Sequence, residues 1–127
     1  MKQEEILAHA RMYSQQKQAV EKEVEKLSVS LMELRNSVKT VEELEENAGL
    51  VPIGGGAFVH ADLHKEKVVI PIGSGYAKEY TPKDADKEIS KRIELTENAL
   101  KKMRGELGKI DEQMARLEKE YRALKKE

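Results

Sequence analysis

Three side chains in the middle of the chain have the residue types of a metal site. His60, Asp62 and His64 are each separated by one residue in the stretch "AFVHADLH". Imidazole and carboxylate groups bind zinc when their donor atoms converge to within about 2.0–2.2 Å of the ion. On an extended strand this spacing places all three side chains on one face. A solvated outer face of a strand is the simpler interpretation, and we expect no metal.

Two glycine clusters have the look of phosphate-binding loops. Residues 51–58 read "VPIGGGAF" and residues 70–77 read "IPIGSGYA", an offset of 19. Neither contains the GxxxxGK[ST] pattern, and neither opens directly into a helix as a phosphate cradle does. We interpret both as tight turns, in which positive φ is easily adopted. The turn glycines are Gly54, Gly56, Gly73 and Gly75.

The remaining composition contains no recognisable catalytic constellation. The 127 residues include no cysteine, which excludes disulfides and thiolate metal sites. Charged residues make up 37% with a net charge of −1, so there is no overall basic field for nucleic acid. No apolar run reaches the roughly 18 residues of a membrane span, and the N-terminus lacks a signal-peptide core. We therefore expect a cytoplasmic protein that is not an enzyme and binds no cofactor, nucleic acid or membrane.

Long heptad repeats flank this middle segment. The first, from residue 3 to about 46, has two apolar rows with steps of seven. The rows are Ile6, Tyr13, Val20, Leu27, Leu34, Val41 and Ala10, Lys17, Val24, Leu31, Val38. Such a narrow stripe predicts a coiled-coil seam. Lys17 is its one charged member; it either fixes register or oligomer state, or extends its ammonium group into solvent.

A second heptad segment begins near Pro82 and Asp84, residue types that favour a helix start. Its rows are Ile93, Leu100, Leu107, Met114, Tyr121 and Ile89, Thr96, Met103, Ile110, Leu117, Leu124. Gly105 and Gly108 lie outside both rows. Because each costs about 1 kcal/mol relative to Ala, we expect this helix to bend or fray there.

Two helices of similar length with a short connection most simply fold back antiparallel. Ile6 would then meet the region of Leu124, and Val41 the region of Ile89, with both chain ends at one tip roughly 65 Å from the middle segment. We expect a helix over residues 1–48, ended by Gly49 as a left-handed cap, an assembly segment over 49–82 and a second helix over 83–127.

The middle segment changes to strand-like alternation and predicts two β-hairpins, 51–63 and 67–81. Isolated hairpins are marginal in water, and open strand edges seek partners. Pro52 and Pro71 suit edge or bulged positions. We therefore expect the strands to form a β-barrel shared between subunits. The expected assembly residues are Val51, Ile53, Phe58, Val59, Leu63, Val68, Val69, Ile70, Ile72 and Tyr76.

Apolar residues also gather near both chain ends. They are Ile6, Leu7, Met12, Tyr13, Met114, Leu117, Tyr121 and Leu124. Methionine and aromatic side chains adapt to varied partners, so these positions are candidates for binding unfolded polypeptides. The alternative is that these residues only pack the helix ends against each other. The two roles are compatible if the helix ends can open.

The block "LVPIGGGAFVHADL" followed by "KVVIPIGSGYAKEYTPKDA", between two heptad helices, resembles the α class of prefoldin subunits, of archaeal type. The resemblance to the α class rests on the two hairpins, because the β class has only one. It implies a hexamer of two α-type and four β-type subunits on a double β-barrel. It also implies capture of unfolded clients by coiled-coil tips without ATP, and transfer to a group II chaperonin.

The expected fold is α+β and mostly α: a long antiparallel coiled-coil hairpin with two central β-hairpins that form an oligomeric barrel. The expected function is that of an ATP-independent chaperone subunit. The alternative is a structural or adaptor coiled coil, oligomerised or self-assembled through its β-hairpins.

Overall fold

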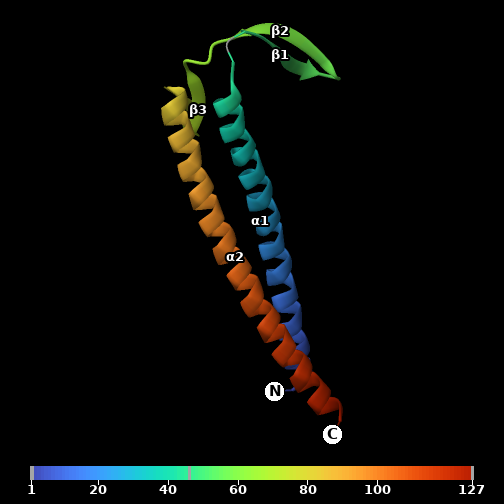
Figure 1. Ribbon diagram of the computed structural model, residues 1–127. Coiled ribbons are helices and arrows are strands. Elements are labelled where there is room, and N and C mark those ends of the chain that lie inside the picture. Colours follow the sequence, from blue (N-terminus) through green and yellow to red (C-terminus); the bar gives the residue numbers. More distant parts are fainter. Residues whose placement is uncertain (1, 46, 127) are drawn as a thin grey trace. The chain divides into compact units, whose positions relative to one another are not determined.

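The computed structural model describes residues 2–45 and 47–126 and contains two long helices and four strands (Figure 1). The order is α1 (Gln3–Glu43), β1 (Asn47–Gly54), β2 (Ala57–Leu63), β3 (Val68–Gly73), β4 (Tyr76–Tyr80) and α2 (Pro82–Lys125). Residues 32–94, with the strands and the adjoining helix segments, form one compact unit. The residues up to Leu31 and those from Leu95 onward form a second, the terminal unit. The mostly helical α+β class is confirmed.

The heptad rows form the buried side of each helix. In α1 every position of the two rows is at least partly buried, and most residues between them are exposed. In α2 the same holds for every row position except Leu124, which is exposed. Since only a two-position stripe is covered, each helix is stabilised by its seam with the other helix. The coiled-coil interpretation is confirmed.

The end of α1 corrects one expectation. The helix ends at Glu43, and residues 47–50 belong to strand β1 instead of closing the helix. Gly49 pairs with Ala61 and does not have a positive φ, so it is not a left-handed cap. A Cβ there would lie 2.6 Å from Cδ1 of Leu63, so glycine allows a close cross-strand contact. The predicted cap was wrong because pairing with β2 satisfies this backbone.

The start of α2 agrees with the sequence. The Thr81 hydroxyl accepts a hydrogen bond from the backbone N–H of Asp84 at 3.2 Å. Thr81 is therefore the N-cap, and Pro82 occupies the first helical position, where its missing N–H costs nothing. From there α2 continues unbroken through Gly105 and Gly108.

The strands form two separate two-stranded antiparallel sheets, β1–β2 and β3–β4. In each, the register shifts next to the proline, between Pro52 and Gly54 and between Pro71 and Gly73. The two turns have nearly the same backbone. φ is 107° and 110° at Gly54 and Gly73, and 78° and 79° at Gly56 and Gly75. The repeated sequence therefore encodes the same turn twice, as predicted, although β1 begins four residues before position 51.

The hairpin β3–β4 packs on the helices, whereas β1–β2 has no buried residue among those that the structure describes. Ile70 of β3 is buried with Ala85 and Ile89 of α2. Partly buried side chains complete this cluster: Leu34, Val38, Val41, Val68, Tyr80 and Ile93. Because the end of α1 meets the start of α2 here, the helices are antiparallel in this unit.

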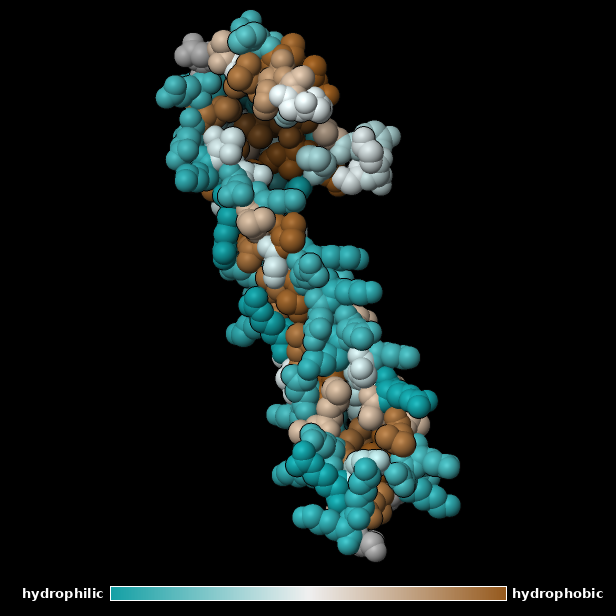
Figure 2. All heavy atoms as spheres, turned by 90° about the vertical axis from the view of Figure 1, so that its right-hand side faces the viewer, coloured by the Kyte–Doolittle hydropathy of each residue, from teal (hydrophilic) through white to brown (hydrophobic). Residues whose placement is uncertain are grey.

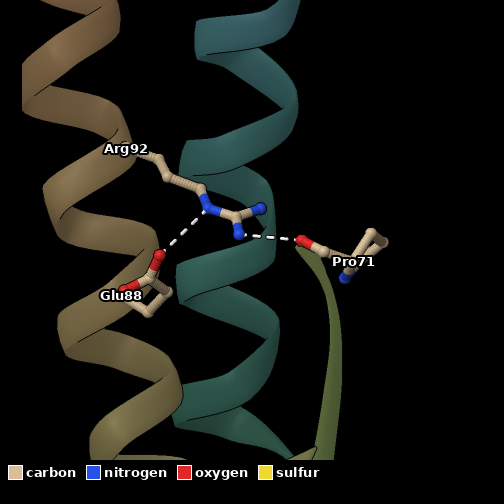
Figure 3. A network of polar contacts seen from close by, with 3 residues as sticks. All are labelled: Pro71, Glu88 and Arg92. Atoms are coloured by element: carbon tan, nitrogen blue, oxygen red, sulfur yellow. Dashed lines mark hydrogen bonds and ion pairs between the residues drawn. The ribbon is translucent and has the colours of Figure 1, made fainter. Parts of the chain in front are cut away.

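A polar contact fixes β3 at the same place. In Figure 3 the guanidinium group of Arg92 reaches from α2 to the carbonyl oxygen of Pro71. Nη2 donates to this oxygen at 2.8 Å, and Nε lies 3.4 Å from the Glu88 carboxylate. Proline offers β3 no N–H, but its carbonyl is satisfied by a charge-assisted hydrogen bond from the chain's own helix.

Candidate functional site

The possible metal ligands remain on the strand surface. His60 and Asp62 lie on β2, His64 follows its last residue, and all three are exposed. Within residues 2–45 and 47–126, no three His, Cys, Asp or Glu residues are grouped so that they could hold a metal ion. The glycine clusters are hairpin turns, and neither leads into a helix. The candidate sites are therefore apolar surfaces.

The first surface lies on the hairpins, where Figure 2 shows apolar side chains gathered. Eight of the ten expected assembly residues are exposed: Val51, Ile53, Phe58, Val59, Leu63, Val69, Ile72 and Tyr76. The other two, Val68 and Ile70, lie against the helices. Leu50 is also exposed on β1, and sequence reasoning missed it because residues 47–50 were assigned to the helix end. We call these nine exposed residues the hairpin surface.

The second surface is a groove of about 440 Å³ between the helix segments of the terminal unit. Its apolar lining is Ile6, Leu7, Ala10, Met114, Ala115, Leu117 and Tyr121, and Asp111 and Glu118 complete it. We call this the tip groove. Five of the eight expected client-binding residues line it, whereas Met12, Tyr13 and Leu124 do not.

The tip groove exists because the seam contains a small residue. Ala10 stands at a heptad position that every other heptad of α1 fills with a larger side chain. Its methyl group cannot fill the space opposite Met114 and Leu117. The smallest member of the apolar rows was the available signal, but sequence reasoning considered only large side chains at the tip. Ile6 is 2% exposed and Leu117 8%, while Leu7 is 44% exposed, so the groove has a closed floor and an open rim.

Two polar contacts involve Tyr121 beside the groove, one with α1 and one within α2. Gln3 Nε2 donates to the Tyr121 hydroxyl at 3.3 Å, and Lys125 Nζ lies 4.8 Å from the Tyr121 ring centroid. The hydrogen bond from Gln3, and then the contact with Lys125, lower the pKa of Tyr121. With Ile6 beside Leu117 and Tyr121, the helices are antiparallel in this unit as well.

Lys17 extends out of the seam to an acidic residue on the other helix. Its Nζ lies 2.8 Å from Oδ1 of Asp111 and 4.0 Å from Oε1 of Glu21. The hydrogen bond and the negative charge of Asp111 raise the pKa of Lys17. The lysine therefore extends its charge toward solvent and forms an exposed ion pair with the other helix.

Comparison with known proteins adds independent findings. The family model described as "Prefoldin subunit" matches residues 13–127. The chain is similar to "Prefoldin subunit alpha" of Methanococcus aeolicus, with 33% identity over 89% of this chain and 83% of that protein. It is also similar to "Prefoldin subunit alpha" of Methanococcoides burtonii, with 26% identity over 89% of this chain and 86% of that protein.

A solved structure has the same fold. It is described as "Cryo-EM structure of filamentous PFD from Methanocaldococcus jannaschii" and aligns with a TM-score of 0.73 at 25% identity, covering 89% of this chain and 98% of that one. No helix in the described part of this chain is both long and apolar enough to cross a membrane. Family model, relatives and fold agree with the two-hairpin arrangement between heptad helices, and the chain belongs to the alpha-subunit class of the prefoldin family.

Proposed function

We propose that this chain is the α-type subunit of a cytoplasmic chaperone that captures unfolded polypeptides with its helix ends, without ATP, and transfers them to a group II chaperonin. Prefoldin subunits are non-enzymatic chaperone components. The observation that carries the proposal is the tip groove, an open apolar cleft at the helix segments that hold both chain ends.

The groove offers an unfolded chain a weak apolar contact. A client side chain placed against Leu7, Ala10 and Met114 loses apolar area to water, at about 25 cal/mol for each Å². Met114 adapts to different shapes because its thioether chain has several rotatable bonds. Opening of the helix ends would add the floor residues Ile6 and Leu117, which are buried when the ends are closed. Several arms that act together make weak contacts sufficient and keep them reversible.

The hairpin surface would supply the assembly. Its residues form an exposed apolar surface of the kind that partners cover, and the outer edges of two-stranded sheets are unpaired. We propose that strands from β-type subunits cover this surface in a hexamer of two α-type and four β-type chains. The shared barrel would then hold the helix ends of several subunits around one client.

The test is suppression of light scattering from a chemically unfolded protein, without nucleotide, by this chain assembled with a β-type subunit. We expect suppression by the intact assembly, and loss when residues 1–13 and 115–127 are deleted. Leu7→Glu should weaken suppression, because it places a charge on the rim of the groove. Leu95→Glu is the matched control, since Leu95 is an exposed leucine of the same unit outside the groove. Equal suppression by Leu7→Glu, Leu95→Glu and the truncated chain would exclude capture at the tips.

A second candidate function is that of a structural coiled coil that assembles with copies of itself. The similar solved structure from Methanocaldococcus jannaschii is of a filamentous form, and this favours the second candidate. Sedimentation of this chain, alone and with a β-type subunit, distinguishes the two. Large homopolymers with no suppression of scattering support the structural role, whereas a defined complex formed only with a β-type subunit supports the chaperone.

A further inference from the structure

We propose that Gly105 and Gly108 form a hinge in α2 that lets residues 109–125 move away from α1 and open the tip groove. The proposal rests on the proposed capture of clients at the helix ends. It adds the residues that control opening, on the face of α2 that points away from the seam.

Packing does not require either glycine. A Cβ built on Gly105 or Gly108 meets no atom within 4 Å beyond its chain neighbours and the adjacent helix backbone, and neither residue has a positive φ. Alanine would therefore fit and would favour the helix, because glycine loses more backbone freedom on folding. Gly49 is the contrast, since a Cβ there would lie 2.6 Å from Leu63. These two glycines lower the local stability of α2 without improving its packing. A local opening of α2 at this point would explain their presence.

The position of the two glycines lowers helix stability at one turn of α2 and leaves α1 unaffected. The glycines are three residues apart and therefore neighbours on one helix face, where both are exposed. They are the only glycines of α2, and α1 contains neither glycine nor proline over Gln3–Glu43. Unwinding of one turn of α2 would thus leave α1 as a continuous rod.

Beyond the hinge, the contacts that hold α2 to α1 are modest. Leu117 is buried, but Leu124 is exposed, and the tip groove leaves a gap in the seam. Two cross-helix polar contacts, Lys17 with Asp111 and Gln3 with Tyr121, involve exposed or half-exposed groups that water and salt can replace. On the near side of the hinge Leu100 is 3% exposed. Opening is therefore expected to stop at the glycines.

The experiment replaces both glycines in the full chain, assembled with its partner subunit. In Gly105→Ala/Gly108→Ala, amide hydrogen exchange of residues 104–109 should slow by roughly thirtyfold, which corresponds to about 2 kcal/mol. The amount of unfolded protein kept soluble should fall several-fold. The matched control is Asn98→Ala/Lys101→Ala, which changes the same outer face one heptad earlier with the same spacing. It should leave capture and exchange at 104–109 unchanged.

The two readouts separate this proposal from the proposed function. Unchanged exchange at residues 104–109 in the glycine variant would show that no hinge is there. Slower exchange with full capture would show that opening is not used to bind clients. If the unmodified assembly does not suppress aggregation at all, the capture function is wrong, and the exchange result still decides whether the glycines open the helix.

Discussion

The two isoleucines that flank Pro71 should respond very differently to truncation. Ile70 is 5% exposed and packs against Ala85 and Ile89, whereas Ile72 is 55% exposed. Removal of a buried isoleucine side chain costs about 2–5 kcal/mol. Because the cluster around Ile70 is completed by partly buried side chains that can relax, we expect Ile70→Ala to cost about 2–3 kcal/mol. Ile72→Ala should cost less than about 0.5 kcal/mol in the unassembled chain.

Urea denaturation followed by circular dichroism, at one fixed protein concentration, measures this difference in the chain alone. Molar mass from light scattering, in the presence of a β-type subunit, gives the second readout. As the protein is diluted, the Ile72→Ala variant should be the more affected of the two. It loses apolar area that a partner would cover, so its complex should dissociate at a higher protein concentration than that of Ile70→Ala. Equal denaturation midpoints for the two variants would refute the docking of β3 on the helices. Equal dissociation would refute the assembly role of the exposed isoleucine.

Four further substitutions test the hairpin turns and two polar contacts. Gly54→Ala and Gly73→Ala should each cost about 1–3 kcal/mol, and by similar amounts, because both turns hold φ near 110°; thermal unfolding compares them. Asp111→Asn should lower stability at neutral pH, since Asp111 raises the pKa of Lys17; that contribution is complete below about 10.5 and is lost as pH rises through the raised value, so melting curves of the two proteins should converge in alkali. Arg92→Lys should cost about 0.5–1.5 kcal/mol in urea denaturation, because an ammonium group cannot reproduce the planar guanidinium contact with the β3 carbonyl.

Periodicity was sufficient to predict the helices and their seam. A step of seven, repeated over five heptads, marks the positions of α1 that are at least partly buried in the structure. The start of α2 was equally predictable, since Pro82 and Asp84 favour a helix start by local chemistry alone. The heptad step and the residue types at a helix start lie within a few residues of the structure they determine. They can therefore be read from a single sequence.

The end of α1 was not predictable in the same way. Gly49 suits both a left-handed helix cap and a close cross-strand contact, and its neighbours alone do not decide between them. The decision depends on Ala61 and Leu63, on a strand that follows the turn. The residues of the tip groove were only partly predictable, for a similar reason. Large residues near the chain ends were recognised, but a gap depends on what faces Ala10 across the seam.

The two hairpins have turns of the same conformation but differ in what covers their strands. This difference bears on assembly. β3 offers Val68 and Ile70 to the helices, and Arg92 satisfies the Pro71 carbonyl, so β3–β4 is fixed within its own subunit. The large apolar side chains of the β1–β2 hairpin are exposed. An uncovered two-stranded sheet is marginal in water, so the first hairpin gains most from a partner. We therefore expect hydrogen exchange to slow more in β1–β2 than in β3–β4 on assembly; equal slowing would show that both hairpins depend on the partner to the same extent.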